Sequence, residues 1–561
     1  MRRRDFLRAG ARSAGLAFGL SRLAATTAAT LPGCGFLHRL IPGDFDVVIR
    51  GGTVVSGNGE PGFPADVGVI GDRIAAIGDL RQKTAGIEID ARRKIVCPGF
   101  IDLHSHSDLT VFGNASADSK IRQGVTTEVV GQDGNSMAPI GWMRSSEWSA
   151  TLRPYGIRDA WRDFDGYFAE LRSAGSPVNI VSMVGAGTLR RYVAEMETRA
   201  LSDWELDEAV RALRKAHAQG ARYLSAGLEY IPGAYATERE LVVLARESQL
   251  YVTHMRNEDD QVLEALREAI RIARKSGAAL HISHIKAQGR RNWDKLDTML
   301  GLLDDARGFR MAVTCDRYPY LAYNNGLINL FPLGIRQGGN AEGAQRLRSA
   351  ADRAAVRPAV QRKIDSLGSY DSVMLSDVRG DYAGYSGEYL GRLAGRLGRD
   401  PYDLLCDIVV AHGGGASMVG FAMSEENLIK LLRYPYCAIA SDGAALNAAS
   451  AGRAHPRNFG TYPKVLGTYV REQRVISLEA AIYKMSGLPA QILGLTDRGV
   501  LAPGNQADVV VFDPERVADR ATYTRPAYPE GIEYVLVNGT PVVFEGGTTG
   551  ARPGQPLPGV A

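Results

Sequence analysis

Short apolar segments alternate with amphipathic segments eight times between Gly99 and about Leu493, and few folds accommodate this pattern. Buried strands that alternate with amphipathic helices are typical of parallel βαβ units. Eight such units predict an α/β fold in which the parallel strands close into a barrel surrounded by helices. The predicted strands are Phe100–His104, Thr126–Gly131, Asn179–Val184, Tyr223–Gly227, Tyr251–His254, Leu280–His284, Ala312–Asp316 and Cys437–Asp442.

Both ends of the chain have a different pattern. Short strand-like runs punctuated by Gly and Asp fill residues 44–98, and runs of the same character return in residues 494–550. The simplest arrangement is a small β-sandwich built from both chain ends, with the barrel at residues 99–493 between its two parts. The long separation of the seventh and eighth strands predicts an insertion at about 323–430 that covers the mouth of the barrel.

The charge of the chain excludes some partners. The formal net charge is +4, but residues 1–34 contain six arginines and a single acid, so the remaining chain has a net charge of about −1. This balance is too small to attract nucleic acid or anionic lipid by bulk charge. A small-molecule substrate is therefore the expected partner, and the oligomeric state is left open.

The amino terminus has the features of an export signal. Arg3-Arg4-Asp5-Phe6-Leu7-Arg8 is typical of the twin-arginine route, which predicts a periplasmic or envelope protein. Leu31-Pro32-Gly33-Cys34 resembles a lipobox, in which the cysteine is lipidated after cleavage; ordinary cleavage near the Ala/Thr run is the alternative. Membrane attachment is expected only through a lipidated Cys34, and residues 1–40 are left out of the fold prediction.

Polar side chains gather at the carboxyl ends of the predicted strands, where barrel enzymes assemble their sites. His104 and His106 follow the first strand at positions i and i+2, so both rings can face one ion. His254, His284 and Asp442 end the fifth, sixth and eighth strands. Imidazole and carboxylate are ligands that zinc accepts, so these residues predict a metal site.

Two other sequence motifs lack residues that their functions require. Gly185-Ala186-Gly187 has Arg190 where a dinucleotide-binding fingerprint needs its third glycine. His412-Gly413-Gly414-Gly415 is similar to a lipase oxyanion loop, but the sequence has no Gly-x-Ser-x-Gly nucleophile elbow. The sequence therefore disfavours an NAD enzyme and a serine hydrolase.

Taken together, the motifs resemble the amidohydrolase superfamily and, within it, the N-acyl-D-amino-acid deacylases (D-aminoacylases). The similarity spans about residues 44–545. The matching motifs are Pro98-Gly99-Phe100-Ile101-Asp102-x-His104-x-His106, Gly124-Val125-Thr126-Thr127, Thr253-His254-Met255-Arg256-Asn257-Glu258, Ile282-Ser283-His284-x-Lys286, Tyr318-Pro319-Tyr320, Ser441-Asp442-Gly443, His455-Pro456-Arg457-x-x-Gly460-Thr461 and Ala507-Asp508-Val509-Val510.

The resemblance implies a TIM-like (β/α)8 metal-dependent hydrolase barrel with a β-sandwich formed by both chain ends. It implies hydrolysis of N-acyl-D-amino acids to a carboxylate and a D-amino acid, with one or two divalent ions, expected to be Zn²⁺. The metal ligands would be His104, His106, His254, His284 and Asp442, with His254 and His284 on the tightly held zinc. Asp442 would also be the catalytic base and acid.

The resemblance also implies substrate-binding residues. Lys286 and Arg457 would bind the α-carboxylate of the substrate, and Tyr318 would line the pocket. A planar guanidinium binds two carboxylate oxygens at once, whereas an ammonium acts as a point charge.

One position departs from the family pattern. The deacylases commonly have Gly-Asn-Cys-Gly after the second strand, with the cysteine as a metal ligand, whereas this chain has Gly131-Gln132-Asp133-Gly134. A carboxylate bridges two ions readily, so Asp133 is predicted to be a ligand. Replacing a soft thiolate by a hard oxygen is expected to change metal preference.

Two alternatives remain at the level of sequence. A cyclic amidase of the hydantoinase or dihydroorotase type has the same barrel, but those enzymes usually carry a carboxylated lysine on the fourth strand, and residues 223–229 contain no lysine. A non-catalytic envelope lipoprotein is the second alternative. A complete ligand set beside Asp442 disfavours it, because binding alone needs neither.

Overall fold

The computed structural model describes residues 43–114, 116–141, 145–157 and 161–559. Eight parallel strands form one sheet in the order β16-β12-β11-β10-β9-β8-β7-β6, and a parallel bridge between Ser105 and Gly443 connects its two edges. All eight predicted strands are present, which confirms the barrel. The strands are β6 (Phe100–Asp102), β7 (Val125–Val130), β8 (Asn179–Gly185), β9 (Arg222–Gly227), β10 (Leu250–His254), β11 (Ala279–Ile282), β12 (Val313–Arg317) and β16 (Cys437–Ile439).

Helices follow the barrel strands and bury one face against them. The helix α6, for example, begins with a capping box in which Ser202 and Glu205 satisfy each other's backbone N–H groups, and α8 ends at Gly277 in the left-handed conformation. The barrel helices include α4 (Phe164–Ala174), α5 (Ala186–Ala194), α6 (Asp203–Ala218), α7 (Glu238–Ala245), α8 (Val262–Ser276), α9 (Lys295–Gly308), α14 (Glu425–Arg433), α15 (Arg457–Lys464), α16 (Leu478–Met485) and α17 (Gly487–Ile492).

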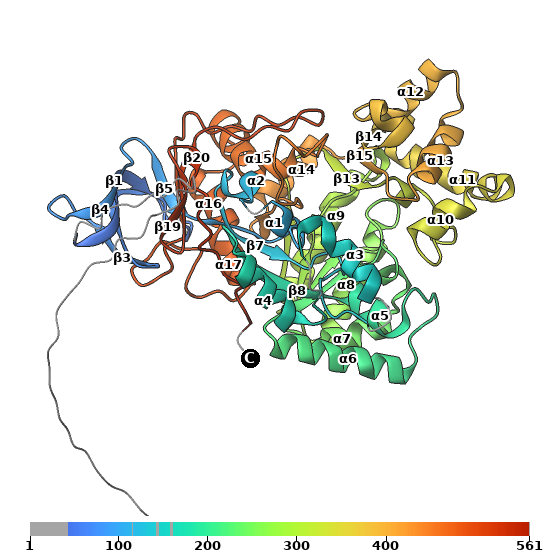
Figure 1. The fold of residues 1–561 in the computed structure, drawn as a ribbon, viewed down its shortest axis with the longest axis horizontal. Helices are drawn as coiled ribbons and strands as arrows, with labels where there is room; N and C mark the ends of the chain where they lie inside the picture. Colours follow the sequence, from blue (N-terminus) through green and yellow to red (C-terminus); the bar gives the residue numbers. More distant parts are fainter. Residues whose placement is uncertain (1–42, 115, 142–144, 158–160, 560–561) are drawn as a thin grey trace, which may run out of the picture. The chain divides into compact units, whose positions relative to one another are not determined.

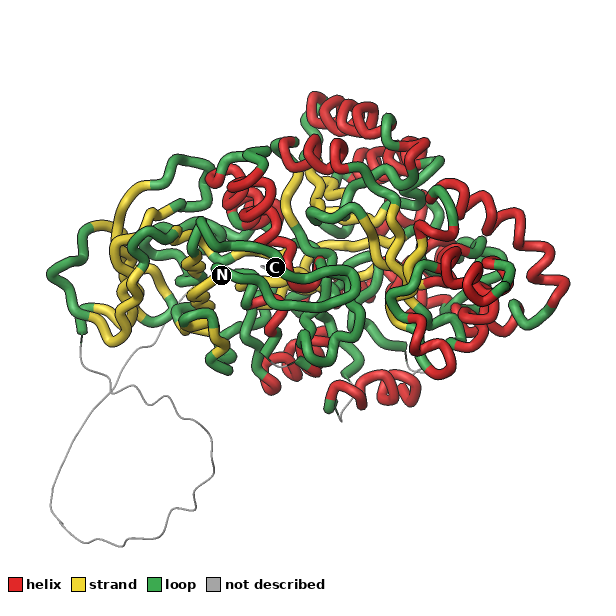
Figure 2. The backbone as a smooth tube through the Cα atoms, turned by 90° about the horizontal axis from the view of Figure 1, so that it is seen from above, coloured by secondary structure: helices red, strands yellow, loops and turns green. Residues whose placement is uncertain are grey.

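The two ends of the described chain share a second sheet. It has nine strands in the order β20-β19-β18-β17-β5-β1-β2-β3, with β4 beside β1, and β5 pairs with β17 across more than four hundred residues of sequence. In Figures 1 and 2 these strands form a group of their own beside the barrel. They are β1 (Phe45–Val54), β2 (Phe63–Ile70), β3 (Arg73–Gly78), β4 (Ala85–Asp90), β5 (Ile95–Pro98), β17 (Val509–Phe512), β18 (Ile532–Val537), β19 (Thr540–Phe544) and β20 (Gly547–Thr548).

Between β12 and β16 the chain builds an additional unit, hereafter the insertion. A three-stranded antiparallel sheet in the order β13-β15-β14 packs with four helices around a separate hydrophobic core that includes Leu327, Val360 and Leu405. Figure 1 shows the helices of the insertion close together, in yellow and orange. The elements are β13 (Ala322–Gly326), α10 (Asn340–Arg346), α11 (Ala350–Leu367), β14 (Val373–Asp377), α12 (Leu390–Leu397), α13 (Pro401–Ala411) and β15 (Ser417–Phe421).

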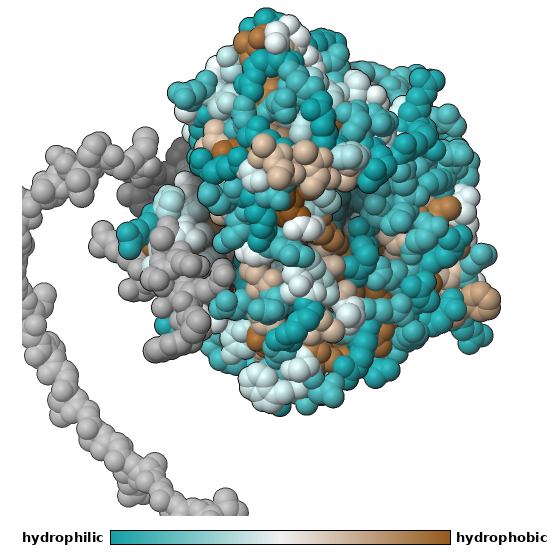
Figure 3. Space-filling view, turned by 90° about the vertical axis from the view of Figure 1, so that its right-hand side faces the viewer, coloured by the Kyte–Doolittle hydropathy of each residue, from teal (hydrophilic) through white to brown (hydrophobic). Residues whose placement is uncertain are grey.

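On the face drawn in Figure 3, hydrophilic residues dominate and hydrophobic residues occur in small groups. No helix within the described ranges has the length and apolar character needed to cross a membrane. The twin-arginine motif and Cys34 lie outside the described residues.

A buried polar network fixes the loops at the carboxyl end of the barrel. Lys120 is fully buried, and its ammonium donates to Asp102 (2.8 Å), to Ser441 Oγ (2.9 Å) and to the carbonyl of Gly443 (3.0 Å). Glu128 lies 3.1 Å from the same nitrogen. The network therefore connects the end of β6, two residues before His104, to both neighbours of Asp442.

We predict that Lys120→Met lowers the free energy of unfolding by roughly 3–5 kcal/mol, because it leaves two carboxylates buried without a cation. Urea-induced unfolding measures the change. Lys430→Met is the control: Lys430 pairs with Asp297 at 2.9 Å in an exposed position, and its loss is expected to leave the unfolding midpoint unchanged. Equal midpoints for Lys120→Met and wild type would contradict the prediction.

Candidate metal centre

The first group of candidate ligands lies between the first and last barrel strands. His104 and His106 follow β6, and Asp442 follows β16. His106 Nε2 lies 3.0 Å from Asp442 Oδ1, and His104 Nε2 lies 3.7 Å from the same oxygen. Asp133, after β7, completes the group at 3.5 Å from His104 Nε2.

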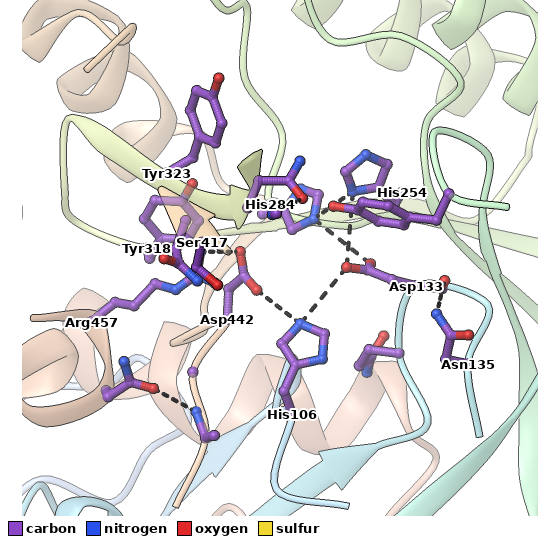
Figure 4. Close-up of a pocket in the computed structure, with 18 of the residues that line it drawn as sticks. His106, Asp133, Asn135, His254, His284, Tyr318, Tyr323, Ser417, Asp442 and Arg457 are labelled. Atoms are coloured by element: carbon purple, nitrogen blue, oxygen red, sulfur yellow. Dashed lines mark hydrogen bonds and ion pairs between the residues drawn. The ribbon is translucent and has the colours of Figure 1, made fainter. Parts of the chain in front are cut away.

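The second group shares Asp133 with the first. His254, at the end of β10, and His284, after β11, bring their facing nitrogens Nδ1 and Nε2 to 3.0 Å from each other. Asp133 Oδ2 lies 3.9 Å from His254 Nδ1, and Asp133 Oδ1 lies 3.7 Å from His284 Nε2. Figure 4 shows His106, Asp133, His254, His284 and Asp442 pointing toward one another. One carboxylate thus faces two sets of imidazoles.

These residues fit a divalent ion. Ligand atoms at tetrahedral positions about 2.05 Å from zinc are about 3.3 Å apart, close to the separations found here. Among the residues that the structure describes, both ring nitrogens of His104 and Asp133 Oδ1 are buried without a hydrogen-bond partner. Buried polar atoms are normally satisfied, so such a cluster of unsatisfied ones is consistent with ligands of an ion.

The backbone holds three of the candidate ligands in an uncommon conformation. The φ angles of Asp133, His284 and Asp442 are 52°, 34° and 52°, in the region that favours glycine. Asp442 N donates to the carbonyl of His104 at 2.8 Å, and His284 N donates to Asp316 Oδ1 at 2.8 Å. Strain of this kind persists only where surrounding contacts fix it, and it is common at functional sites.

The electrostatics favour bound positive charge. Burial by itself would lower the pKa of His104, but the carboxylates of Asp133 and Asp442 hold that pKa well above its usual range. Burial would raise the pKa of Asp442, but Arg457 and His104 hold it well below its usual range. Asp133 is likewise held well below its usual pKa by His104 in spite of its burial. Both acids are therefore ionised and available to a cation.

Two further carboxylates, which the sequence prediction missed, contact the outer nitrogens of the second group. Glu258 Oε1 lies 3.1 Å from His284 Nδ1, and Glu229 Oε2 lies 3.2 Å from His254 Nε2. With the proton on Nε2 of His254, its inner nitrogen Nδ1 presents a lone pair toward Asp133 and His284. At His284 the outer nitrogen also lies 2.8 Å from the ammonium of Lys286, which can only donate. Burial raises the pKa of Glu229, but Lys363 and His254 lower it to about 2. The position of both acids shortly after a strand end was the available signal.

His106, Asp133, His254, His284 and Asp442 line a cavity of about 410 Å³ whose wall also includes Tyr230, Tyr318, Asn324 and Arg457. Arg457 Nη1 donates to Asp442 Oδ2 at 2.6 Å, and its guanidinium carbon lies 5.3 Å from the centre of the Tyr318 ring. Within the described part of the chain, Arg457 Nε and the Tyr318 hydroxyl have no hydrogen-bond partner. Donors are thus available beside Asp442.

Lys286 also lines the cavity, but its ammonium is already engaged. It donates to Glu258 at 2.6 Å and to the carbonyl of His284 at 3.0 Å, and it is buried. His281 does not line the cavity and instead contacts Asp316 at 2.8 Å and Thr314 at 2.8 Å.

Comparison with known proteins gives consistent matches. The model of the Amidohydrolase family matches residues 88–320 and 436–543. The chain is 36% identical to an N-acyl-D-glutamate deacylase of Alcaligenes xylosoxydans xylosoxydans over 519 residues, which are 91% of this chain and 96% of that enzyme. It is 35% identical to a D-aminoacylase of the same organism over 523 residues, which are 91% of this chain and 97% of that enzyme.

Solved structures agree. An N-acyl-D-glutamate deacylase of Bordetella bronchiseptica, crystallised with zinc and a phosphonate inhibitor, has a TM-score of 0.78 and 35% identity, covering 92% of this chain and 100% of that chain. A D-aminoacylase described with a binuclear metal centre has a TM-score of 0.77 and 33% identity, with the same coverage.

Proposed function

This chain belongs to the amidohydrolase family, and from that premise we propose that it hydrolyses the amide bond of N-acyl-D-amino acids to a carboxylate and a free D-amino acid. The proposal rests on two groups of candidate ligands that share Asp133. Asp442, a member of the first group, also forms an ion pair with Arg457. The combination suits hydrolysis of an N-acyl amino acid, because a candidate ion, an ionised acid and a carboxylate-binding cation surround one cavity.

We propose that the resident metal is zinc. His104, His106, Asp133 and Asp442 would hold one ion, and Asp133, His254 and His284 a second. A divalent ion in such a site, when bound, lowers the pKa of water from 15.7 to about 7 and stabilises negative charge on the amide oxygen. Zinc accepts imidazole and carboxylate ligands. The shared carboxylate of Asp133 is a hard oxygen ligand, whereas a thiolate in the same position would be a soft sulfur ligand.

Asp442 would act as the general base and general acid of the reaction. Its Oδ1 faces the ligand groups, where it accepts the proton of the attacking water, and the same acid then returns that proton to the leaving nitrogen. Its Oδ2 is held by Arg457, which fixes the orientation of the carboxylate. One side chain therefore acts first as base and then as acid.

Arg457 and Tyr318 would bind the α-carboxylate of the substrate. The guanidinium retains a donor without a partner among the described residues, and the buried hydroxyl of Tyr318 lies at the same wall. Lys286 contributes positive charge to that region, although Glu258 neutralises much of it. We therefore assign the carboxylate mainly to Arg457, with Lys286 in a supporting role.

The alternatives have less support. A cyclic amidase usually carries a carboxylated lysine on the fourth strand, whereas here β9 has no lysine and Asp133, after β7, occupies the shared position between the two groups. A lipoprotein without catalytic activity would have no use for an ionised, strained Asp442 beside a candidate metal site.

A comparison of enantiomers tests the proposal. We expect purified, zinc-supplemented protein to release D-glutamate or D-methionine from the N-acetyl compounds with a kcat/KM about 100-fold or more above that for the L enantiomers. With its carboxylate at Arg457 and its amide at the ligand groups, the L form would direct its side chain toward a different wall of the cavity from the D form, and that third contact is expected to decide the rate. Amino acid release is followed by chromatography, with 5-methylhydantoin as the control. Ring opening of the hydantoin without release from either N-acetyl-D compound would refute the proposal.

We further propose export by the twin-arginine route, with retention in the envelope if Cys34 is lipidated; the motif Arg3-Arg4 supports this. Changing both arginines to lysine is expected to leave the protein in the cytoplasm, as measured by cell fractionation and immunoblotting. Equal export of the variant and the wild type would refute the route.

A further inference from the structure

We propose that Glu229 is a positioning residue that fixes the ring of His254 for metal binding, and that Lys363 of the insertion holds Glu229 in place. The inference rests on the metal centre of the proposed function. It assigns a role in metal binding to the insertion, which also contributes Asn324 and Ser417 to the lining of the cavity.

The two histidines of the second group have different outer partners. The outer nitrogen of His284 lies 3.1 Å from Glu258 and 2.8 Å from the ammonium of Lys286, and Glu258 is itself held by Lys286 (2.6 Å) and Gln288 (2.7 Å). All these residues follow barrel strands, so the support of His284 is complete within the barrel. A carboxylate behind a metal-bound imidazole fixes both its tautomer and its orientation.

The outer nitrogen of His254 depends on the insertion instead. Glu229 follows β9 and places Oε2 3.2 Å from His254 Nε2. Its other oxygen, Oε1, lies 3.5 Å from the ammonium of Lys363, which is on α11. Lys363 also forms an ion pair with Asp259 at 2.7 Å, five residues after His254. The ammonium thus joins two loops of the barrel to one helix of the insertion.

Lys363, Glu229 and Asp259 are largely buried, so loss of the Lys363–Glu229 contact is expected to affect the position of Glu229. The side chains of Lys363, Glu229 and Asp259 are 20%, 17% and 9% exposed. Water therefore screens the three charges only in part, and Glu229 without Lys363 would be free to turn away from His254 toward solvent. Lys363 lies outside residues 88–320 and 436–543, so the part of the chain that the family model matches does not include this anchor.

Zinc affinity of the full chain tests the inference. Metal is removed with a chelator, and zinc is titrated back in competition with a chromogenic chelator. Glu229→Gln is expected to raise the zinc Kd by 10–100-fold, as is usual when such a partner is lost. Lys363→Met is expected to raise the Kd about fivefold or more, although the removal of a positive charge would by itself tighten cation binding. Lys363→Arg, which keeps the anchor, is expected to stay within about threefold of wild type.

A double-mutant cycle separates anchoring from a general charge effect. In the Glu229→Gln background, Lys363→Met is expected to cause no further loss of zinc affinity, because its effect acts through Glu229. Lys275→Met is the matched control: it breaks an exposed ion pair with Glu238 on the barrel helices and should leave the Kd unchanged. Thermal unfolding verifies that each variant is folded, and Lys363→Gln replaces Lys363→Met if the latter is not.

Unchanged or tighter zinc binding by Lys363→Met or its Lys363→Gln substitute would overturn the inference, as would an equal loss in the Glu229→Gln background. Failure of the wild-type chain to bind zinc would instead refute the metal centre of the proposed function. The two failures are therefore distinguishable.

Discussion

Asp442→Asn is expected to reduce kcat by about 10²–10⁴-fold while leaving metal content and folding intact, because general acid and base catalysis contributes an effect of this size. With its oxygen in the position of Oδ1, the amide leaves the group around His106 a donor atom, at the cost of turning its NH2 toward Arg457 in place of Oδ2. It has no basic oxygen to accept the proton of the attacking water. Asparagine also tolerates the φ of 52° at this position better than most residues, so the backbone needs no rearrangement.

Steady-state kinetics with an N-acetyl-D-amino acid measures the loss, and elemental analysis and thermal unfolding verify that metal and fold are retained. Asp297→Asn, at an exposed position, is the matched control and should have wild-type kinetics. A kcat within a few-fold of wild type would remove Asp442 from the proton-transfer role. A parallel loss of metal would show that ligation, and not proton transfer, explains the effect.

The barrel could be predicted because most of its strands are short, largely apolar runs followed by an amphipathic helix, and this pattern is local. Asp133 was predicted only from the resemblance to the deacylases. The other five candidate ligands could be predicted for a related reason: parallel strands bring their carboxyl ends to one edge. That rule places His104, His254 and Asp442 together without knowledge of any side-chain contact.

The partners of these ligands could not be predicted in the same way. Lys363 reaches Glu229 from a helix more than a hundred residues away, and no periodicity marks that contact. Lys286 is a second example. Its type and position suggested a contact with the substrate, but in the structure its ammonium donates to Glu258 and to the carbonyl of His284. Charge pairing in a folded site depends on tertiary geometry, which sequence spacing alone does not supply.

Asp133→Ala is expected to lower bound metal more than the loss of any single histidine, because Asp133 is the residue that both ligand groups share. Its Oδ1 faces His104 and His284, and its Oδ2 faces His106 and His254, all at 3.5–3.9 Å. Removing the carboxylate takes a donor from both ions and leaves four imidazoles without the negative charge between them. His106→Ala, by contrast, takes a donor from the first group alone.

Elemental analysis after dialysis against a weak chelator measures the difference: His106→Ala should keep most of the metal of the second group, and Asp133→Ala should lose metal from both. Alanine at a φ of 52° adds a strain of about 1 kcal/mol, so Asp133→Asn is included to separate strain from ligation. Asparagine keeps one oxygen but no charge, and is expected to retain intermediate amounts of metal. Wild-type metal content in Asp133→Ala would mean that the carboxylate is not a ligand, and that the imidazoles alone define the centre.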